Sequence, residues 1–81
     1  MQPLTLYVAT WCDPCHELQE WLKDHDVGVT LVNAGRMSRS ERTSLGIFSV
    51  PTMKDSKGNL YIGREQIKPF IEGRSYEKSS N

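Results

Sequence analysis

The sequence predicts a small α/β domain with the element order β-α-β-α-β-β-α and a four-stranded mixed sheet flanked by helices. Three observations support this fold class. The 81 residues, 37% of them hydrophobic, suffice for one domain with a modest core. Short β-rich apolar runs alternate with segments whose apolar residues recur at helical spacing. Glycines and prolines fall at the junctions between these segments.

The first half of the chain predicts a strand, a helix and a second strand. Residues 4–9, LTLYVA, form a short apolar run rich in β-formers and are predicted to be a buried strand. From Pro14 to about His25 the apolar residues follow helical spacing, and a proline near the first position is typical of a helix start. Residues 27–34, VGVTLVNA, are predicted to be the second strand.

A short helix and a hairpin are expected next. Residues 38–45 predict a helix that ends at Gly46. Pro51 argues against a central strand through its position, so the next strand should begin after it. Residues 53–56 and 59–62, joined by a turn at Lys57-Gly58, are typical of an antiparallel hairpin.

The chain should close with a helix and a tail. Residues 64–72 predict the last helix, preceded by Gly63 and ended by Gly73. We expect one domain over residues 1–74 and a flexible tail over 75–81, whose composition is of low complexity.

The charge balance excludes several classes of partner. Ten basic and ten acidic side chains give a formal net charge of zero, which removes the general electrostatic argument for binding nucleic acid or an anionic membrane.

The first residues carry no basic region, and their apolar run is too short for a signal peptide or membrane span. We expect a cytoplasmic monomer.

The Cys-x-x-Cys-His motif that begins at Cys12 has several interpretations: a redox pair, half of a zinc site, covalent haem attachment or a structural disulfide. A closed zinc site needs four ligands, and apart from the cysteines only His16 and His25 remain. Haem proteins of this type, with Met37 or Met53 as axial ligand, are normally exported and helical. A reducing cytosol disfavours a structural disulfide. The redox pair is favoured, without a bound metal.

The two cysteines occupy different places at the predicted helix start. Cys12 lies in the connection from the first strand, where unpaired NH groups and the helix dipole favour a thiolate. Cysteines in such settings have pKa values of about 3.5 to 7.5. Cys15, one turn into the helix, should be more buried. The asymmetry suits attack by Cys12 and resolution by Cys15. The charge of Asp13 should raise the thiolate pKa, which favours a reducing protein.

Three segments of the chain resemble the thioredoxin and glutaredoxin families. WCDPC, residues 11–15, resembles the Trp-Cys-x-Pro-Cys site of thioredoxins, and LGIFSVPT, residues 45–52, resembles their segment leading to a cis-proline. KGNLYIGREQIKPFI, residues 57–71, is similar to the glutaredoxin ending, as is the overall plan, which begins at the first catalytic strand. The resemblance covers about residues 4–73 and implies a glutaredoxin-like redoxin with the thioredoxin fold.

The resemblance also implies roles for individual residues. Cys12 would be the nucleophile, Cys15 the resolving thiol and Pro51 a cis-proline facing them. Substrate would be bound beside them by five residues: Trp11, Val50, Thr52, Gly63 and Arg64. Of these, the backbone of Val50 would pair with an extended substrate chain, and Arg64 would receive a substrate carboxylate.

The implied activity is that of a small dithiol–disulfide oxidoreductase without a bound cofactor. Its substrates would be protein disulfides, those of ribonucleotide reductase among them, or glutathione mixed disulfides. Glutathione would be the reductant. The alternatives are a thioredoxin-like electron donor reduced by a flavoprotein, thioredoxin reductase, and a protein-binding module of the same fold without redox chemistry.

The sequence departs from both families at specific positions. Thioredoxins carry a buried acid beneath the resolving cysteine, and Leu6 occupies that position here. Glutaredoxins have two glycines and an aspartate before the last helix, where this chain has one glycine followed by Arg64 and Glu65. Arg64 should attract the carboxylates of glutathione and Glu65 should repel them.

The remaining candidates have weaker patterns. His16 could stabilise the Cys12 thiolate or be a solvated residue of the first turn. Trp21 and His25 are expected to pack on the helix. Three further arginines are predicted to form a solvated face: Arg36, Arg39 and Arg42.

Overall fold

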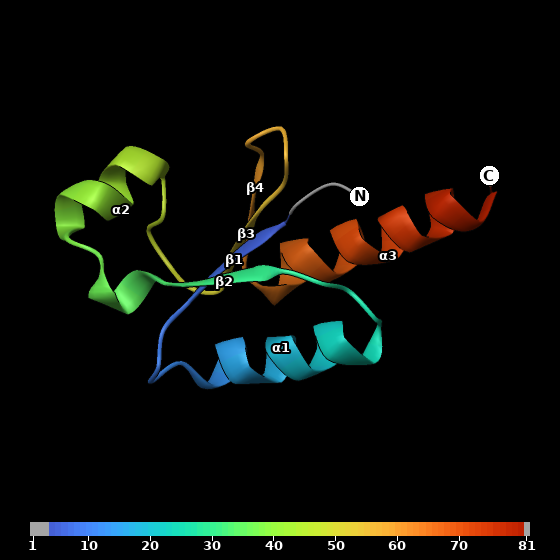
Figure 1. Cartoon of the computed structure of the whole chain (residues 1–81), viewed down its shortest axis with the longest axis horizontal. Helices are drawn as coiled ribbons and strands as arrows, with labels where there is room; N and C mark the ends of the chain where they lie inside the picture. The colour runs from blue at the N-terminus through green and yellow to red at the C-terminus, as the bar shows by residue number, and fades with distance from the viewer. Residues whose placement is uncertain (1–3, 81) are drawn as a thin grey trace.

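The computed structural model describes the backbone of residues 4–80 and the side chains of residues 4–73. Within residues 4–80, four strands, three α-helices and one short 3-10 helix follow one another (Figure 1). Their bounds are β1 (Thr5–Val8), α1 (Asp13–Asp24), β2 (Thr30–Asn33), η1 (Ala34–Arg36), α2 (Arg39–Leu45), β3 (Thr52–Lys54), β4 (Leu60–Ile62) and α3 (Arg64–Ser80).

The four strands form one mixed sheet in the order β2-β1-β3-β4. β1 and β2 are parallel, with Tyr7 beside Val32, whereas β1–β3 and β3–β4 are antiparallel. A parallel pair needs a crossover, and α1 provides it. The predicted fold class, a four-stranded mixed sheet with flanking helices in the thioredoxin-like arrangement, is confirmed.

The larger core lies between the sheet and two helices, α1 and α3. Leu18 and Leu22 from α1 and Ile67 and Ile71 from α3 meet one face of the sheet, and almost nothing of these side chains is exposed. The sheet contributes Leu6 and Met53, and Leu4 precedes it. This packing holds the first turn of α1, and with it the two cysteines, against the end of β1.

The opposite face of the sheet carries a smaller cluster. Tyr7, Ala34 and Ile47 are buried there, with Val32 and Met37 packed beside them. None of the described residues of α2 is itself buried, so this helix is held by the segments on either side of it.

Local signals account for the ends of α2. Ser38 caps the first turn: its hydroxyl accepts from the backbone NH of Glu41 at 3.1 Å, and the Glu41 carboxylate accepts from the NH of Ser38 at 2.9 Å. Gly46 ends the helix in the left-handed conformation at φ 79°, which glycine adopts without steric cost. The predicted helix over 38–45 is confirmed.

The outer half of α1 packs as predicted. The rings of Trp21 and His25 stack with their centroids 3.9 Å apart, and Lys68 Nζ lies 5.4 Å from the Trp21 ring centroid. Lys68 belongs to α3, so these contacts join the two helices at the end remote from the cysteines.

Two predicted boundaries are wrong. α3 does not end at Gly73 but continues to Ser80, because a glycine lowers helix propensity by only about 1 kcal/mol and does not exclude helix. The predicted tail is therefore helical up to Ser80, Asn81 lies outside the described residues, and the flexibility of the tail stays a prediction. The second strand is shorter than 27–34, since η1 begins at Ala34.

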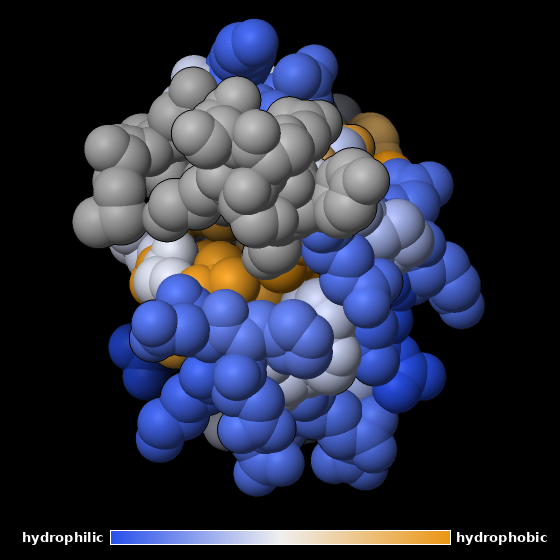
Figure 2. All heavy atoms as spheres, turned by 90° about the vertical axis from the view of Figure 1, so that its right-hand side faces the viewer, coloured by the Kyte–Doolittle hydropathy of each residue, from blue (hydrophilic) through white to orange (hydrophobic). Residues whose placement is uncertain are grey.

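Some large apolar side chains are exposed at the surface. The right-hand end of the molecule in Figure 1 faces the viewer in Figure 2, and outside the atoms drawn in grey its visible surface is mainly hydrophilic, with a small hydrophobic area between the hydrophilic side chains. The exposed large hydrophobic residues are Trp11, Leu31, Leu45, Phe48 and Ile62. No helix within the described part of the chain is both long enough and apolar enough to cross a membrane.

The turn between β3 and β4 is organised by Asp55. Its carboxylate accepts from the backbone NH groups of Lys57 and Asn59, both at 2.9 Å, and from the Tyr61 hydroxyl at 3.1 Å. Partial burial raises the pKa of Asp55, but these hydrogen bonds outweigh that effect and place the pKa below its ordinary value. The ionised carboxylate therefore stabilises the hairpin.

We expect Asp55→Asn to lower the free energy of unfolding at pH 7. A carboxyl whose folded pKa is depressed contributes stability above its unfolded pKa and loses it as pH falls through the folded value. The difference between wild type and variant should hence shrink below about pH 5. Denaturant titrations at pH 7 and pH 3, with Lys57→Ala as a control that keeps the carboxylate, measure it; an equal difference at both pH values would exclude a role for the charge.

Candidate functional site

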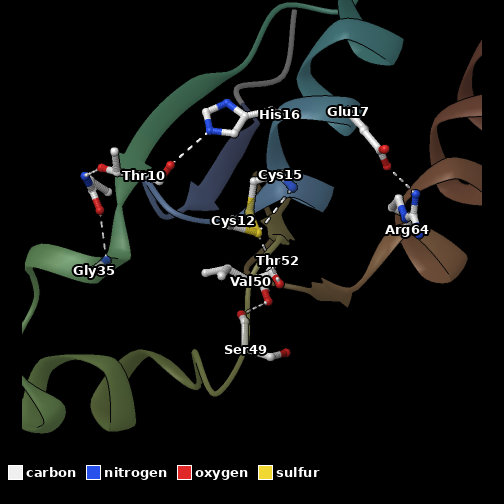
Figure 3. Close-up of a disulfide and its surroundings, with 11 residues drawn as sticks. Thr10, Cys12, Cys15, His16, Glu17, Gly35, Ser49, Val50, Thr52 and Arg64 are labelled. Atoms are coloured by element: carbon white, nitrogen blue, oxygen red, sulfur yellow. Dashed lines mark hydrogen bonds and ion pairs between the residues drawn. A yellow bond between two sulfur atoms is a disulfide. The ribbon is translucent and has the colours of Figure 1, made fainter.

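Cys12 and Cys15 form a disulfide at the start of α1, with their Cα atoms 5.3 Å apart (Figure 3). Cys12 is the N-cap residue, and its sulfur accepts from the backbone NH of Cys15 at 3.2 Å. Cys12 is 5% exposed and Cys15 is fully buried, in the order that the sequence predicts. The cap geometry places a donor NH and the positive end of the helix dipole at the Cys12 sulfur.

The surroundings of the buried sulfur are apolar. Ala9, Cys12 and Cys15 form a small cluster with Val8 and Val50 packed against it. Among the described residues, Thr52 is the one polar or charged side chain that is buried, so no buried carboxylate lies beneath Cys15. Leu6, which occupies the position of the buried acid of thioredoxins, is fully buried in the larger core.

The loop before β3 faces the disulfide. The Val50–Pro51 peptide bond is cis, as the resemblance implies, and the Val50 carbonyl oxygen lies 3.9 Å from Cys12 Sγ. Thr52 is buried, and its hydroxyl donates to the Ser49 carbonyl at 2.7 Å, which closes the loop. The NH of Gly63 donates to the Pro51 carbonyl at 2.9 Å and ties the loop to the start of α3.

His16 points away from the sulfurs. Its Nε2 lies 3.1 Å from the Thr10 carbonyl oxygen, and the side chain is exposed (Figure 3). Of the two interpretations, the solvated residue of the first turn agrees with this geometry. The imidazole contacts the connection between β1 and α1 rather than the Cys12 sulfur.

Arg64 is already paired in the structure. Its guanidinium donates to Glu17 Oε2 at 2.8 Å, and both side chains are largely exposed. This ion pair joins α3 to α1 beside the disulfide (Figure 3). The prediction of Arg64 as a carboxylate receptor considered Glu65 and overlooked Glu17, because 47 residues separate the pair in sequence.

Two exposed aromatic side chains line a pocket that also contains Val50, the residue beside Cys12 Sγ. Trp11 is 77% exposed and Phe48 is 78% exposed. Both line a pocket of about 290 Å³ together with Ala9, Ala34, Gly35, Arg42, Ile47, Ser49 and Val50. Trp11 was expected to contact substrate, but Phe48 was not singled out. Its signal was a large aromatic residue three positions before Pro51, in a loop.

The sequence prediction also missed a contact between the last residue of β2 and the segment that follows β1, the parallel neighbour of β2. Asn33 Nδ2 donates to Thr10 Oγ1 at 3.2 Å, and Asn33 Oδ1 accepts from the NH of Gly35 at 2.9 Å. The carboxyl ends of neighbouring parallel strands meet at one edge of a sheet, which is the signal that could have found it. These bonds fix η1 beside Trp11.

No family model matches the sequence, and a search of curated proteins finds no match. Among the described residues there is no group of three or more His, Cys, Asp or Glu side chains that could hold a metal ion.

Proposed function

We propose that the protein is a small dithiol–disulfide oxidoreductase of the glutaredoxin-like redoxin type, with Cys12 as nucleophile. The observation that carries this proposal is the position of Cys12 as the N-cap of α1, bonded to Cys15 and accepting from its NH. A thiolate at that position is stabilised by the NH and the helix dipole, and thiolates are the species that attack disulfides.

The reaction takes place in two exchanges. In the reduced protein the Cys12 thiolate attacks one sulfur of a substrate disulfide, which forms a mixed disulfide and releases the first substrate thiolate. The Cys15 thiolate then attacks Cys12 Sγ, releases the second substrate thiolate and leaves the Cys12–Cys15 disulfide. The substrate gains two electrons, the protein loses two, and the protons of the two thiols go to solvent or to the released thiolates.

The surrounding loop suits a polypeptide substrate. The Val50 backbone lies beside Cys12 Sγ, where it can pair with an extended chain, and exposed Trp11 adds an apolar contact surface. We propose protein disulfides in the cytoplasm as the substrates. Those of ribonucleotide reductase and glutathione mixed disulfides are the specific candidates that the family resemblance suggests.

The direct test is a stoichiometric one. The protein is reduced, freed of reductant, and mixed with oxidised insulin under anaerobic conditions, and thiols on each species are counted. The proposal requires the loss of two protein thiols for each insulin disulfide reduced. Persistence of both protein thiols beside intact insulin and intact small disulfides would favour the non-redox binding module.

Glutathione is the proposed electron donor, and the ion pair between Arg64 and Glu17 sharpens its test. Arg64→Ala should raise the apparent KM for glutathione, whereas Glu65→Gln should lower it, each by roughly 1.5- to 5-fold, the range of one exposed ion pair. Glu17→Gln, which frees the Arg64 guanidinium, should also lower it. Steady-state turnover over a glutathione series measures these constants.

The opposite result would identify a different donor. If none of the three substitutions moved the constant while a thioredoxin reductase reduced the protein efficiently, the thioredoxin-like alternative would replace the glutathione proposal. The dithiol mechanism itself would be unaffected by that outcome.

A further inference from the structure

We propose that the pocket between Trp11, Arg42 and Phe48 selects acidic polypeptide segments, so that the preferred substrates carry a carboxylate side chain close to the cysteine that is attacked. This inference rests on the proposed disulfide exchange and specifies the substrate class of the same site.

The pocket adjoins the sulfur chemistry through Val50. The Val50 carbonyl lies 3.9 Å from Cys12 Sγ, and Val50 also lines the pocket. A chain bound in extended form advances about 3.3 Å per residue. A side chain within about three residues of the attacked cysteine can therefore reach the pocket while the cysteine sulfur contacts Cys12.

Arg42 is the charged group of this pocket. It is half-buried on α2, and no ion pair or hydrogen bond of its guanidinium is found among the described residues. The neighbouring acid, Glu41, turns its carboxylate to the start of the helix, where it accepts from the NH of Ser38. A half-buried cation without a counter-ion attracts a carboxylate more strongly than a fully solvated one does.

The residues around Arg42 also favour an acidic ligand. Arg36 and Arg39 precede it along the same segment, and Asp13, the acid between the two cysteines, does not line the pocket. Trp11 and Phe48 form exposed aromatic walls. The pocket thus offers an apolar surface beside one cation.

The test compares disulfide peptides that differ in one residue beside the cysteine: Glu, Gln or Lys. We expect the wild-type protein to reduce the Glu peptide with a kcat/KM about 5-fold above the Gln peptide, as one partly screened ion pair allows, and the Lys peptide least well. Arg42→Gln should abolish this preference, so that the ratio of kcat/KM for the Glu peptide to that for the Gln peptide falls from about 5 to about 1. The preference should fall at high salt.

Two control variants separate the pocket from general charge. Arg39→Gln removes an arginine of α2 that does not line the pocket, and it should keep the preference. Phe48→Ala should lower kcat/KM for all three peptides by the same factor, because it removes an apolar wall of the pocket without changing its charge. The Arg42 guanidinium forms no ion pair or hydrogen bond with the described residues. We therefore expect Arg42→Gln to fold, and circular dichroism checks this.

Each outcome has one meaning. If Arg42→Gln kept the preference, or Arg39→Gln lost it equally, selection by the pocket would be overturned. If wild type reduced no peptide at all, the proposed function would fail instead. The pocket would then still be tested by binding: cysteine-free Glu and Gln peptides titrated against wild type and Arg42→Gln should show the same difference.

Discussion

Replacing Cys12 with Ser is expected to abolish disulfide reduction, whereas Cys15→Ser should accumulate a mixed disulfide with a protein substrate. Cys12 holds the N-cap position at the edge of the site and Cys15 is fully buried behind it, so only Cys12 can meet a substrate sulfur. Without Cys15 the second exchange has no internal thiol. Insulin reduction measures the first effect, and non-reducing electrophoresis with mass spectrometry measures the second.

The matched control assays the same two single variants on glutathione mixed disulfides instead of protein disulfides. Cys15→Ser should keep some turnover on glutathione mixed disulfides, because a single thiol suffices when external glutathione resolves the adduct. Full activity of Cys15→Ser toward protein disulfides would contradict the dithiol mechanism. Trapping through Cys15 in the Cys12→Ser variant would reverse the assigned roles.

Leu18→Ala should produce a large loss of stability. Leu18 is completely buried between α1 and the sheet, and removing a buried leucine side chain costs about 2–5 kcal/mol. A domain of 81 residues has a small stability reserve, so the variant should unfold at much lower denaturant concentration. Urea titration followed by circular dichroism gives the free energy of unfolding.

Leu31→Ala is the control for that truncation. Leu31 undergoes the same chemical change but is 52% exposed on the edge strand β2, and surface substitutions usually change stability by no more than about 0.5 kcal/mol. A similar loss in both variants would mean that burial against the sheet does not hold α1 in place.

The local features of the fold were predictable because their causes lie within a few residues. Pro14 near the helix start and Gly46 after α2 mark helix ends through their own backbone preferences. Pro51 correctly placed the start of β3 after it. Gly73 misled the prediction, because a glycine permits a helix end without requiring one and α3 continues past it.

The sequence by itself determined the order of elements, the Cys-x-x-Cys pair at a helix start and the greater burial of Cys15, because these follow from spacing along one chain. Only the tertiary structure decided which distant groups meet. Arg64 pairs with Glu17, and Arg42 joins Trp11 and Phe48 in one pocket. Such contacts depend on how α2 and α3 pack around the sheet, and no local periodicity encodes that relation between segments far apart in sequence.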